Sequence, residues 1–446
     1  MKKVVAMNRA VKTVTLSALA ACAAHSQAEI QYEFHGETRL RFEHLDEQFR
    51  NNQTGSDQAL LARTLLGASA SSGGWTLAGE IIDARELGNI AKEDSNLNTS
   101  TIDPLDILQL NVQYQANDFL LANTHSNITL GRFTMNLGSR RLAARNNYRN
   151  TINAFEGALW QIEGKNSQQL QLFYTHPVAR LIDGPATDND PKRDEAITST
   201  DFWGAAFTTP LADRFTAEFY GLRLNETDSR KYPSRNRQLT TVVASLQPSE
   251  ASTWYWQTEL AYQWGESRSS TSSDVALDHS AYFGHFELGP NAPVAGGKLR
   301  LQLDIASGDR DPTDDNNNRF DTLYGARRFD FGPTSLYGAF ARANIISPGI
   351  RWQIKSKKAG ETMLSLRHFE LENNSDSWTS AGISPAAYNS NTAEVGQQLE
   401  VRWRWHNSPK NLLLELGAAY LFAGELMQDA NKDDSTYTYS QITYKF

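Results

Sequence analysis

The sequence has a single cysteine, Cys22, and after the N-terminal region no apolar run approaches the roughly eighteen residues that a membrane-spanning helix needs. Disulfide bonds therefore cannot stabilise the chain. Helical membrane spans are excluded, and the mean hydropathy of −0.52 is typical of a chain with a large water-facing surface. Positive charge is also scarce, because the net charge is −8, which argues against nucleic acid as a partner.

The N-terminal region has the pattern of a secretory signal peptide. Its apolar run over residues 14–24 follows several positive charges and is too short to span a bilayer. Ser26-Gln-Ala28 offers a small-x-small cleavage site, so we expect residues 1–28 to be removed. The loss of four positive charges and no acid changes the net charge from −8 to −12. A second interpretation stays open, because Leu19-Ala-Ala-Cys22 resembles a lipobox that would leave Cys22 lipidated.

The last ten residues, 437–446, present two chemically different faces. Side chains of a strand alternate with period 2, so Ile442, Tyr444 and Phe446 share one face, which suits lipid, and Gln441 lies on the other, which suits water. The free edge of this strand must pair with another strand, most simply the first, and that pairing closes a barrel. The terminal Phe446 is similar to the C-terminal signature of bacterial outer-membrane barrels, so we expect this strand to meet the barrel-assembly machinery.

The same alternation recurs along the chain. Residues 30–44 place six ionisable groups on one face, and their length exceeds the usual strand of about 5–6 residues and is enough to cross a bilayer. The pattern predicts an all-β fold, a transmembrane antiparallel up-and-down β-barrel of eighteen strands that forms one domain over residues 29–446. We expect the strands near residues 30–44, 59–70, 75–87, 106–116, 127–135, 153–163, 168–176, 200–209, 214–224, 238–246, 253–264, 280–288, 298–306, 348–356, 361–371, 395–406, 411–421 and 436–446.

Three connections, over residues 182–200, 307–347 and 373–393, are too long for hairpins. The segment 307–347 contains more aromatic and apolar residues than a freely solvated loop carries, among them Tyr324 and Phe331. We therefore expect it to fold over or into the mouth of the pore.

Arginine is concentrated in the segment from Gly131 to Arg149. Guanidinium groups are permanently charged, bidentate partners for carboxylates, and rings of arginine in a pore select anions. If acidic residues gather in exposed loops, the arginines set the local field of the lumen. An alternative is that each arginine pairs with a luminal carboxylate and only stiffens the wall. We expect the luminal anion-binding residues to be Arg39, Arg41, Arg132, Arg141, Arg300, Arg351, Arg402 and Arg404.

Several motifs together resemble the alginate export porin family. They are Gly131-Arg132, Gly138-Ser-Arg-Arg-Leu142, Phe155-Glu-Gly157, Ala306-Ser-Gly-Asp-Arg310, Asn316-Asn-Asn-Arg-Phe-Asp321, Val395-Gly-Gln-Gln-Leu399, Pro409-Lys-Asn-Leu412 and Gln441-Ile-Thr-Tyr-Lys-Phe446. The resemblance implies an outer-membrane barrel of eighteen strands that passes an anionic polyuronate through an arginine-rich lumen, with anion-binding roles for Arg132, Arg141, Arg402 and Arg404. It also implies a monomer in contact with membrane lipid, lipopolysaccharide and an anionic polysaccharide or oligosaccharide.

Other functions remain as alternatives. The barrel is expected to lack a cofactor and catalytic residues, because the sequence has no H-x-x-x-H spacing and no G-x-S-x-G motif. Asp309, Asp311 and Asp314 are weak metal candidates without the spacing of a calcium loop. A channel for other small anionic or amphipathic solutes, or a structural barrel plugged by its loops, would show the same strands. Export and import are equally compatible with the sequence.

Overall fold

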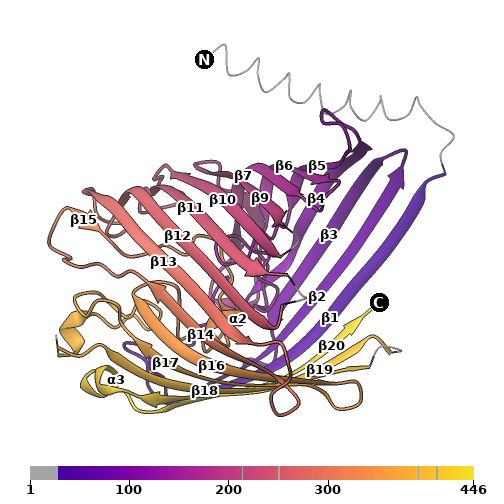
Figure 1. The fold of residues 1–446 in the computed structure, drawn as a ribbon. Helices are drawn as coiled ribbons and strands as arrows, with labels where there is room; N and C mark the ends of the chain where they lie inside the picture. Colours follow the sequence, from indigo (N-terminus) through magenta and orange to yellow (C-terminus); the bar gives the residue numbers. More distant parts are fainter. Residues whose placement is uncertain (1–28, 213, 250–251, 390, 408–409) are drawn as a thin grey trace.

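The computed structural model describes residues 29–446 except 213, 250–251, 390 and 408–409, so the predicted signal peptide and Cys22 lie outside the described residues. The described chain is almost entirely β-structure (Figure 1). Two of its twenty strands are short and belong to loops, β8 (Pro191–Ala196) and β15 (Asn316–Asn317). The other eighteen form the wall: β1 (Gln31–Asp46), β2 (Asp57–Ser72), β3 (Trp75–Glu86), β4 (Asp103–Asn117), β5 (Thr124–Phe133), β6 (Phe155–Gly164), β7 (Gln169–Ile182), β9 (Thr200–Leu211), β10 (Phe215–Glu226), β11 (Gln238–Pro248), β12 (Trp254–Arg268), β13 (Ala276–Pro290), β14 (Lys298–Ala306), β16 (Ile345–Ser356), β17 (Gly360–Glu370), β18 (Glu394–Asn407), β19 (Leu412–Ala423) and β20 (Ser435–Lys445).

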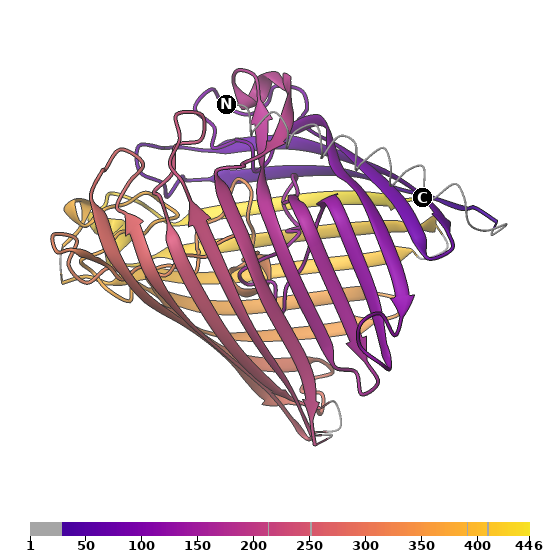
Figure 2. The ribbon, with the colours of Figure 1, turned by 90° about the horizontal axis from the view of Figure 1, so that it is seen from above.

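The wall is closed by its first and last strands. β1 pairs with β20 in antiparallel register, with Leu40 opposite Ile442, and Gly36 and Phe446 exchange main-chain hydrogen bonds of 2.8 and 3.0 Å. Each of the other wall strands pairs antiparallel with the next wall strand, and the strands lie side by side with a common tilt (Figure 2). The predicted barrel of eighteen antiparallel strands is confirmed.

The alternation of the sequence becomes the two surfaces of the wall. In β1 the charged Arg39, Arg41 and Glu43 are buried, whereas Leu40 and Phe42 between them are 41% and 38% exposed on the outside. Exposed apolar side chains recur on the outer face of most strands. This inverted distribution suits a barrel whose outer surface contacts hydrocarbon and whose interior is polar.

The two ends of the barrel differ. The connections after β2, β4, β6, β9, β11, β13, β16 and β18 are short, and we call this the short-turn end. The other connections make the long-loop end, and they contain the short helices η1 (Ala186–Asp188), α2 (Arg328–Phe331), η2 (Pro385–Ala387) and α3 (Glu425–Asp429). Among the described residues, no helix has the length and apolar character required to cross a membrane.

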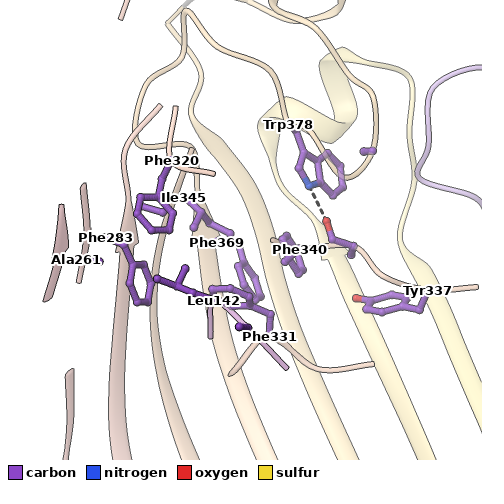
Figure 3. Close-up of a cluster of buried hydrophobic side chains, with 14 of the residues drawn as sticks. Leu142, Ala261, Phe283, Phe320, Phe331, Tyr337, Phe340, Ile345, Phe369 and Trp378 are labelled. Carbon is purple, nitrogen blue, oxygen red and sulfur yellow. Dashed lines mark hydrogen bonds between the residues drawn. The ribbon is translucent and has the colours of Figure 1, made fainter. Parts of the chain in front are cut away.

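Two long connections fold into the barrel rather than away from it. We call them the inserted loops: residues 134–154, between β5 and β6, and residues 307–344, between β14 and β16. In the second loop Phe340 stacks on Phe369 of the wall with a centroid distance of 3.4 Å, and Trp378 Nε1 donates to the carbonyl of Ala339 at 2.8 Å (Figure 3). The sequence prediction that residues 307–347 fold inward is confirmed.

Candidate pore and anion-binding site

Asp330, in α2 inside the barrel (Figure 1), joins the two inserted loops. Nε and Nη2 of Arg141, in the other inserted loop, donate to its two carboxylate oxygens at 3.0 Å each, and Arg342 pairs with the same carboxylate. The Asp330 carbonyl accepts from Nη1 of Arg367 in β17 at 3.0 Å. The inserted loops are therefore held to each other and to the wall by buried charged hydrogen bonds.

The charge state of Asp330 predicts how this contact responds to pH. Burial raises the pKa of Asp330, but Arg141 and Arg342 outweigh burial and hold it well below its ordinary value of 3.8. A carboxylate whose pKa is lower in the folded than in the unfolded protein stabilises the folded state at any pH above its unfolded pKa of about 3.9. This stabilisation is lost only as the pH falls through the pKa of the folded state.

We therefore expect single-channel conductance to be the same at pH 7 and at about pH 4.5, since Asp330 stays ionised over this interval. Bilayer recordings at matched salt measure this. A stepwise rise of conductance within the interval would show that another group holds the inserted loops.

Most of the predicted anion-binding arginines lie beside carboxylates. Arg141 also contacts Glu259. The expectation that acidic residues gather in exposed loops is wrong for the carboxylates that pair with these arginines, because they lie on the inner wall. They are Glu43, Glu259, Glu287, Glu361 and Glu415. The closest ion-pair distances are Arg41–Glu43 3.4 Å, Arg141–Glu259 3.0 Å, Arg300–Glu287 3.7 Å, Arg402–Glu361 3.4 Å and Arg404–Glu415 2.9 Å. For these five arginines the charge is neutralised by a neighbouring carboxylate, as the alternative expects.

Arg39 and Arg351 contact the inserted loops instead of carboxylates. Nη2 of Arg39 donates to the carbonyl of Arg149 at 2.8 Å, and Nη2 of Arg351 donates to the carbonyl of Phe329 at 2.6 Å. Carbonyl acceptors leave the guanidinium charge in place but occupy its donors. Both residues hold loop backbone against the wall, and direct contact with a solute stays a prediction for them.

Arg132 does not face the lumen. In the register of the wall it lies opposite Leu110 of β4 and Glu156 of β6, and Leu110 is 53% exposed on the outer surface. Its guanidinium pairs with Glu156 at 3.3 Å and donates to the Asp194 carbonyl at 3.2 Å. The luminal placement of Arg132 was wrong because period-2 alternation puts it on the same face as Leu130.

Three other arginines meet at the long-loop end. Arg50, Arg149 and Arg327 line a cavity of about 620 Å³, which we call the arginine pocket, and no aspartate or glutamate lines it. Among the described residues none of the three forms an ion pair within 4.0 Å, and their donors reach neutral oxygens, such as the Ser380 hydroxyl for Arg327 at 3.2 Å. A Cβ on Gly338 would lie 3.1 Å from Nη2 of Arg327 and 3.7 Å from Nη2 of Arg50, so two guanidinium groups lie close together.

No carboxylate in the lining of the arginine pocket compensates these three charges, and burial together with neighbouring arginines lowers their pKa values. Burial, then the charge of Arg327, lowers the pKa of Arg50 to about 10. Burial and the charge of Arg342 lower the pKa of Arg327 to about 10, and burial with Arg180 and Arg327 lowers the pKa of Arg149 well below its ordinary value. Nε of Arg149 is buried without a hydrogen-bond acceptor. A bound carboxylate would supply the missing charge and acceptor.

A second cavity, of about 810 Å³, opens at the short-turn end. Its walls are β1 to β4, and amides and hydroxyls dominate the lining, including Gln109, Asn111, Gln113 and Ser69. The inserted loops lie between the two ends of the barrel.

Comparison with known proteins agrees with this architecture. A family model described as alginate export matches residues 30–441. The chain belongs to the alginate export family. No curated protein matches this alginate export family member.

Solved porins share its fold. OpdO of Pseudomonas aeruginosa is 13% identical, with a TM-score of 0.58 over 93% of this chain and 97% of that one. OccK8 (OprE) of the same organism is 11% identical, with a TM-score of 0.57 over 93% and 98%. The structure of P. aeruginosa OpdK with vanillate is 13% identical, with a TM-score of 0.56 over 93% and 98%. The alginate export family protein is thus an outer-membrane β-barrel and a transport channel rather than an enzyme.

The weak metal candidates are occupied by local contacts. Asp311 accepts from the Thr313 hydroxyl at 2.6 Å, Asp314 accepts from the main chain of Asn316 at 2.7 Å, and Asp309 accepts from the main chain of Asn318 at 3.3 Å. Within the described ranges, one group of three potential ligands converges, and it contains His285, Asp304 and Asp330. Both of its carboxylates already pair with arginines, which compete with a cation.

The sequence identified only part of the arginine pocket. Arg149 belongs to the arginine-dense segment and Arg327 to the loop expected to fold inward, but Arg50 lies in a separate connection, between β1 and β2. A usable signal was present, because three neutral amide residues, Asn51, Asn52 and Gln53, follow Arg50 directly.

Proposed function

We propose that this channel passes carboxylate-bearing saccharides, namely alginate or a related polyuronate as polymer or oligosaccharide. The observation that carries the proposal is the arginine pocket, where Arg50, Arg149 and Arg327 converge without a carboxylate partner in the cavity lining. Guanidinium groups bind carboxylates in bidentate fashion, and an uncompensated group of them at a pore mouth raises the local concentration of anions. The volume of about 620 Å³ lies within the range of about 300–1,000 Å³ usual for ligand sites.

The wall arginines have a supporting role in this proposal. Arg41, Arg300, Arg402 and Arg404 of the wall, together with Arg141 of the first inserted loop, are paired with carboxylates, so they shape the lumen rather than set its net charge. We propose further that the channel works as a monomer among lipopolysaccharide and other membrane lipids. β20, with Phe446, is the strand proposed to meet the barrel-assembly machinery.

A channel for small carboxylates is the second candidate. It is favoured by one comparison, because OpdK, which has a similar fold, was solved with vanillate, a carboxylate. A small-solute channel conducts without block by polymer, whereas a saccharide channel is blocked by polyuronate and a plugged structural barrel does not conduct. Conductance with and without added alginate oligosaccharide separates the three.

Charge reversal in the arginine pocket tests the proposal. We expect the unmodified pore to prefer anions and the double variant Arg149→Glu/Arg327→Glu to prefer cations, because four units of charge change in one confined cavity. Each lost charge-assisted contact is worth about 1.5–3 kcal/mol, so block by alginate oligosaccharide should weaken at least about ten-fold. Reversal potentials under a salt gradient in planar bilayers measure the selectivity.

Lys165→Glu is the matched control, since it makes the same kind of change on an exposed turn between β6 and β7 at the short-turn end. Its reversal potential should stay close to that of the unmodified pore. Cation preference in the unmodified pore would contradict the proposal, and anion preference without oligosaccharide block would favour the second candidate.

A further inference from the structure

Arg223, in β10, points out of the barrel near the long-loop end. The residues before and after it, Leu222 and Leu224, are 2% and 1% exposed inside the barrel, so alternation puts Arg223 on the outer face. In register it lies between Trp203 of β9 and Thr240 of β11. A charged side chain facing lipid is costly toward the membrane centre and tolerated close to the interface.

Neutral groups hold the guanidinium of Arg223 in place. Nε donates to Asn225 Oδ1 at 2.7 Å and Nη1 donates to Thr240 Oγ1 at 2.9 Å, while Gln238 accepts two longer bonds of 3.4 Å through its carbonyl and side-chain oxygens. Every acceptor is uncharged, and in the described part of the chain Arg223 has no ion-pair partner within 4.0 Å. The orientation of the group is fixed while its charge is not neutralised.

In the described part of the chain, neither carboxylate of the next outer-face row forms an ion pair with Arg223. Asp201, one row closer to the long-loop end and opposite Asn225, accepts from the Tyr174 hydroxyl at 2.6 Å. Glu266 lies in the same row, opposite Gln238. Arg85 of β3 also points outward, and it pairs with Asp83 at 2.7 Å. Arg223 thus differs from Arg85 in charge compensation.

Aromatic residues flank Arg223 along the same row. Trp203 is 44% exposed, and Trp264, opposite Thr240 on the far side, is 39% exposed. Exposed tryptophans on a barrel form girdles at the level of the lipid headgroups. The row therefore places a fixed, uncompensated cation at headgroup depth, where lipid phosphates lie.

We propose that Arg223, framed by Trp203 and Trp264, binds the phosphate of a membrane lipid on the outer face of the barrel. The phosphate would complete the hydrogen bonding of Nη2 and neutralise the charge. This site is separate from the pore and does not depend on the proposed cargo.

Binding of lipid A to the purified barrel in detergent tests the inference. We expect lipid A to bind the unmodified protein. It should bind the Arg223→Gln variant about ten-fold more weakly, because one charge-assisted contact is lost. Arg85→Gln is the matched control and should bind as the unmodified protein does, since Asp83 already neutralises that arginine. Unchanged single-channel conductance verifies that each variant is folded.

Dephosphorylated lipid A and inorganic phosphate distinguish the source of the anion. Binding that requires both Arg223 and the phosphate on the lipid supports the inference. Equal binding of dephosphorylated lipid A, equal loss in the two variants, or inorganic phosphate that binds as tightly as lipid A through Arg223 would each overturn it.

Discussion

Replacing residues 323–341 by a short glycine-serine linker is expected to raise single-channel conductance several-fold. These residues form the part of the second inserted loop that crosses the interior, and Phe331, Tyr337 and Phe340 within it are at most 2% exposed. They pack against the wall through contacts such as the stacking of Phe340 on Phe369 (Figure 3). Removing them clears side chains from the cross-section while the eighteen wall strands keep their pairing.

Single-channel recordings in symmetric salt measure the effect. Deletion of residues 270–274, an exposed stretch between β12 and β13, is the control for shortening a loop and should leave conductance unchanged. If the 323–341 variant folds and conducts as the unmodified pore does, the inserted loop does not limit the current.

Replacing Asp330 by alanine is expected to have the largest effect on stability among single substitutions. It leaves Arg342 buried without its ion-pair partner and leaves Arg141 with Glu259 alone. Breaking a buried ion pair by removing one partner costs about 3–5 kcal/mol, because the remaining charge is neither solvated nor neutralised. The inserted loops should then separate from each other, so we also expect noisier and larger currents.

Urea-induced unfolding of the barrel in detergent, together with single-channel recordings, checks this prediction. Asp311→Ala is the matched control, because Asp311 is an exposed aspartate in the same connection. A loss of stability no greater than that of the control would mean that the loops are held by their aromatic contacts and not by Asp330.

Much of the wall was predictable from local pattern. The strands expected near residues 30–44 and 298–306 appear as Gln31–Asp46 and Lys298–Ala306, because a strand with one lipid-facing and one water-facing surface must alternate with period 2. Pairing of the terminal strand with the first was also predictable, since an unpaired strand edge in a membrane leaves backbone groups without partners. The inward fold of residues 307–344 followed from their aromatic content.

The candidate site was only partly predictable. Arg402 and Glu361 are far apart in sequence, and their 3.4 Å contact depends on the register between β17 and β18. The luminal arginines were recognised as a group, but their carboxylate partners were assigned to exposed loops. Arg132 was misplaced although Leu130, two residues earlier, marked its face as the outer one.

The sequence by itself determined which residues form the wall, how many strands it has and which face of each strand meets lipid. These features follow from the period-2 alternation of a strand and from the requirement that its backbone N–H and C=O groups be hydrogen-bonded in a membrane. Only the tertiary structure decided which arginines keep an uncompensated charge. Arg50, Arg149 and Arg327 come from three connections and meet in one cavity. Coulomb interactions depend on distance and burial, and both are set by folding rather than by position in the chain.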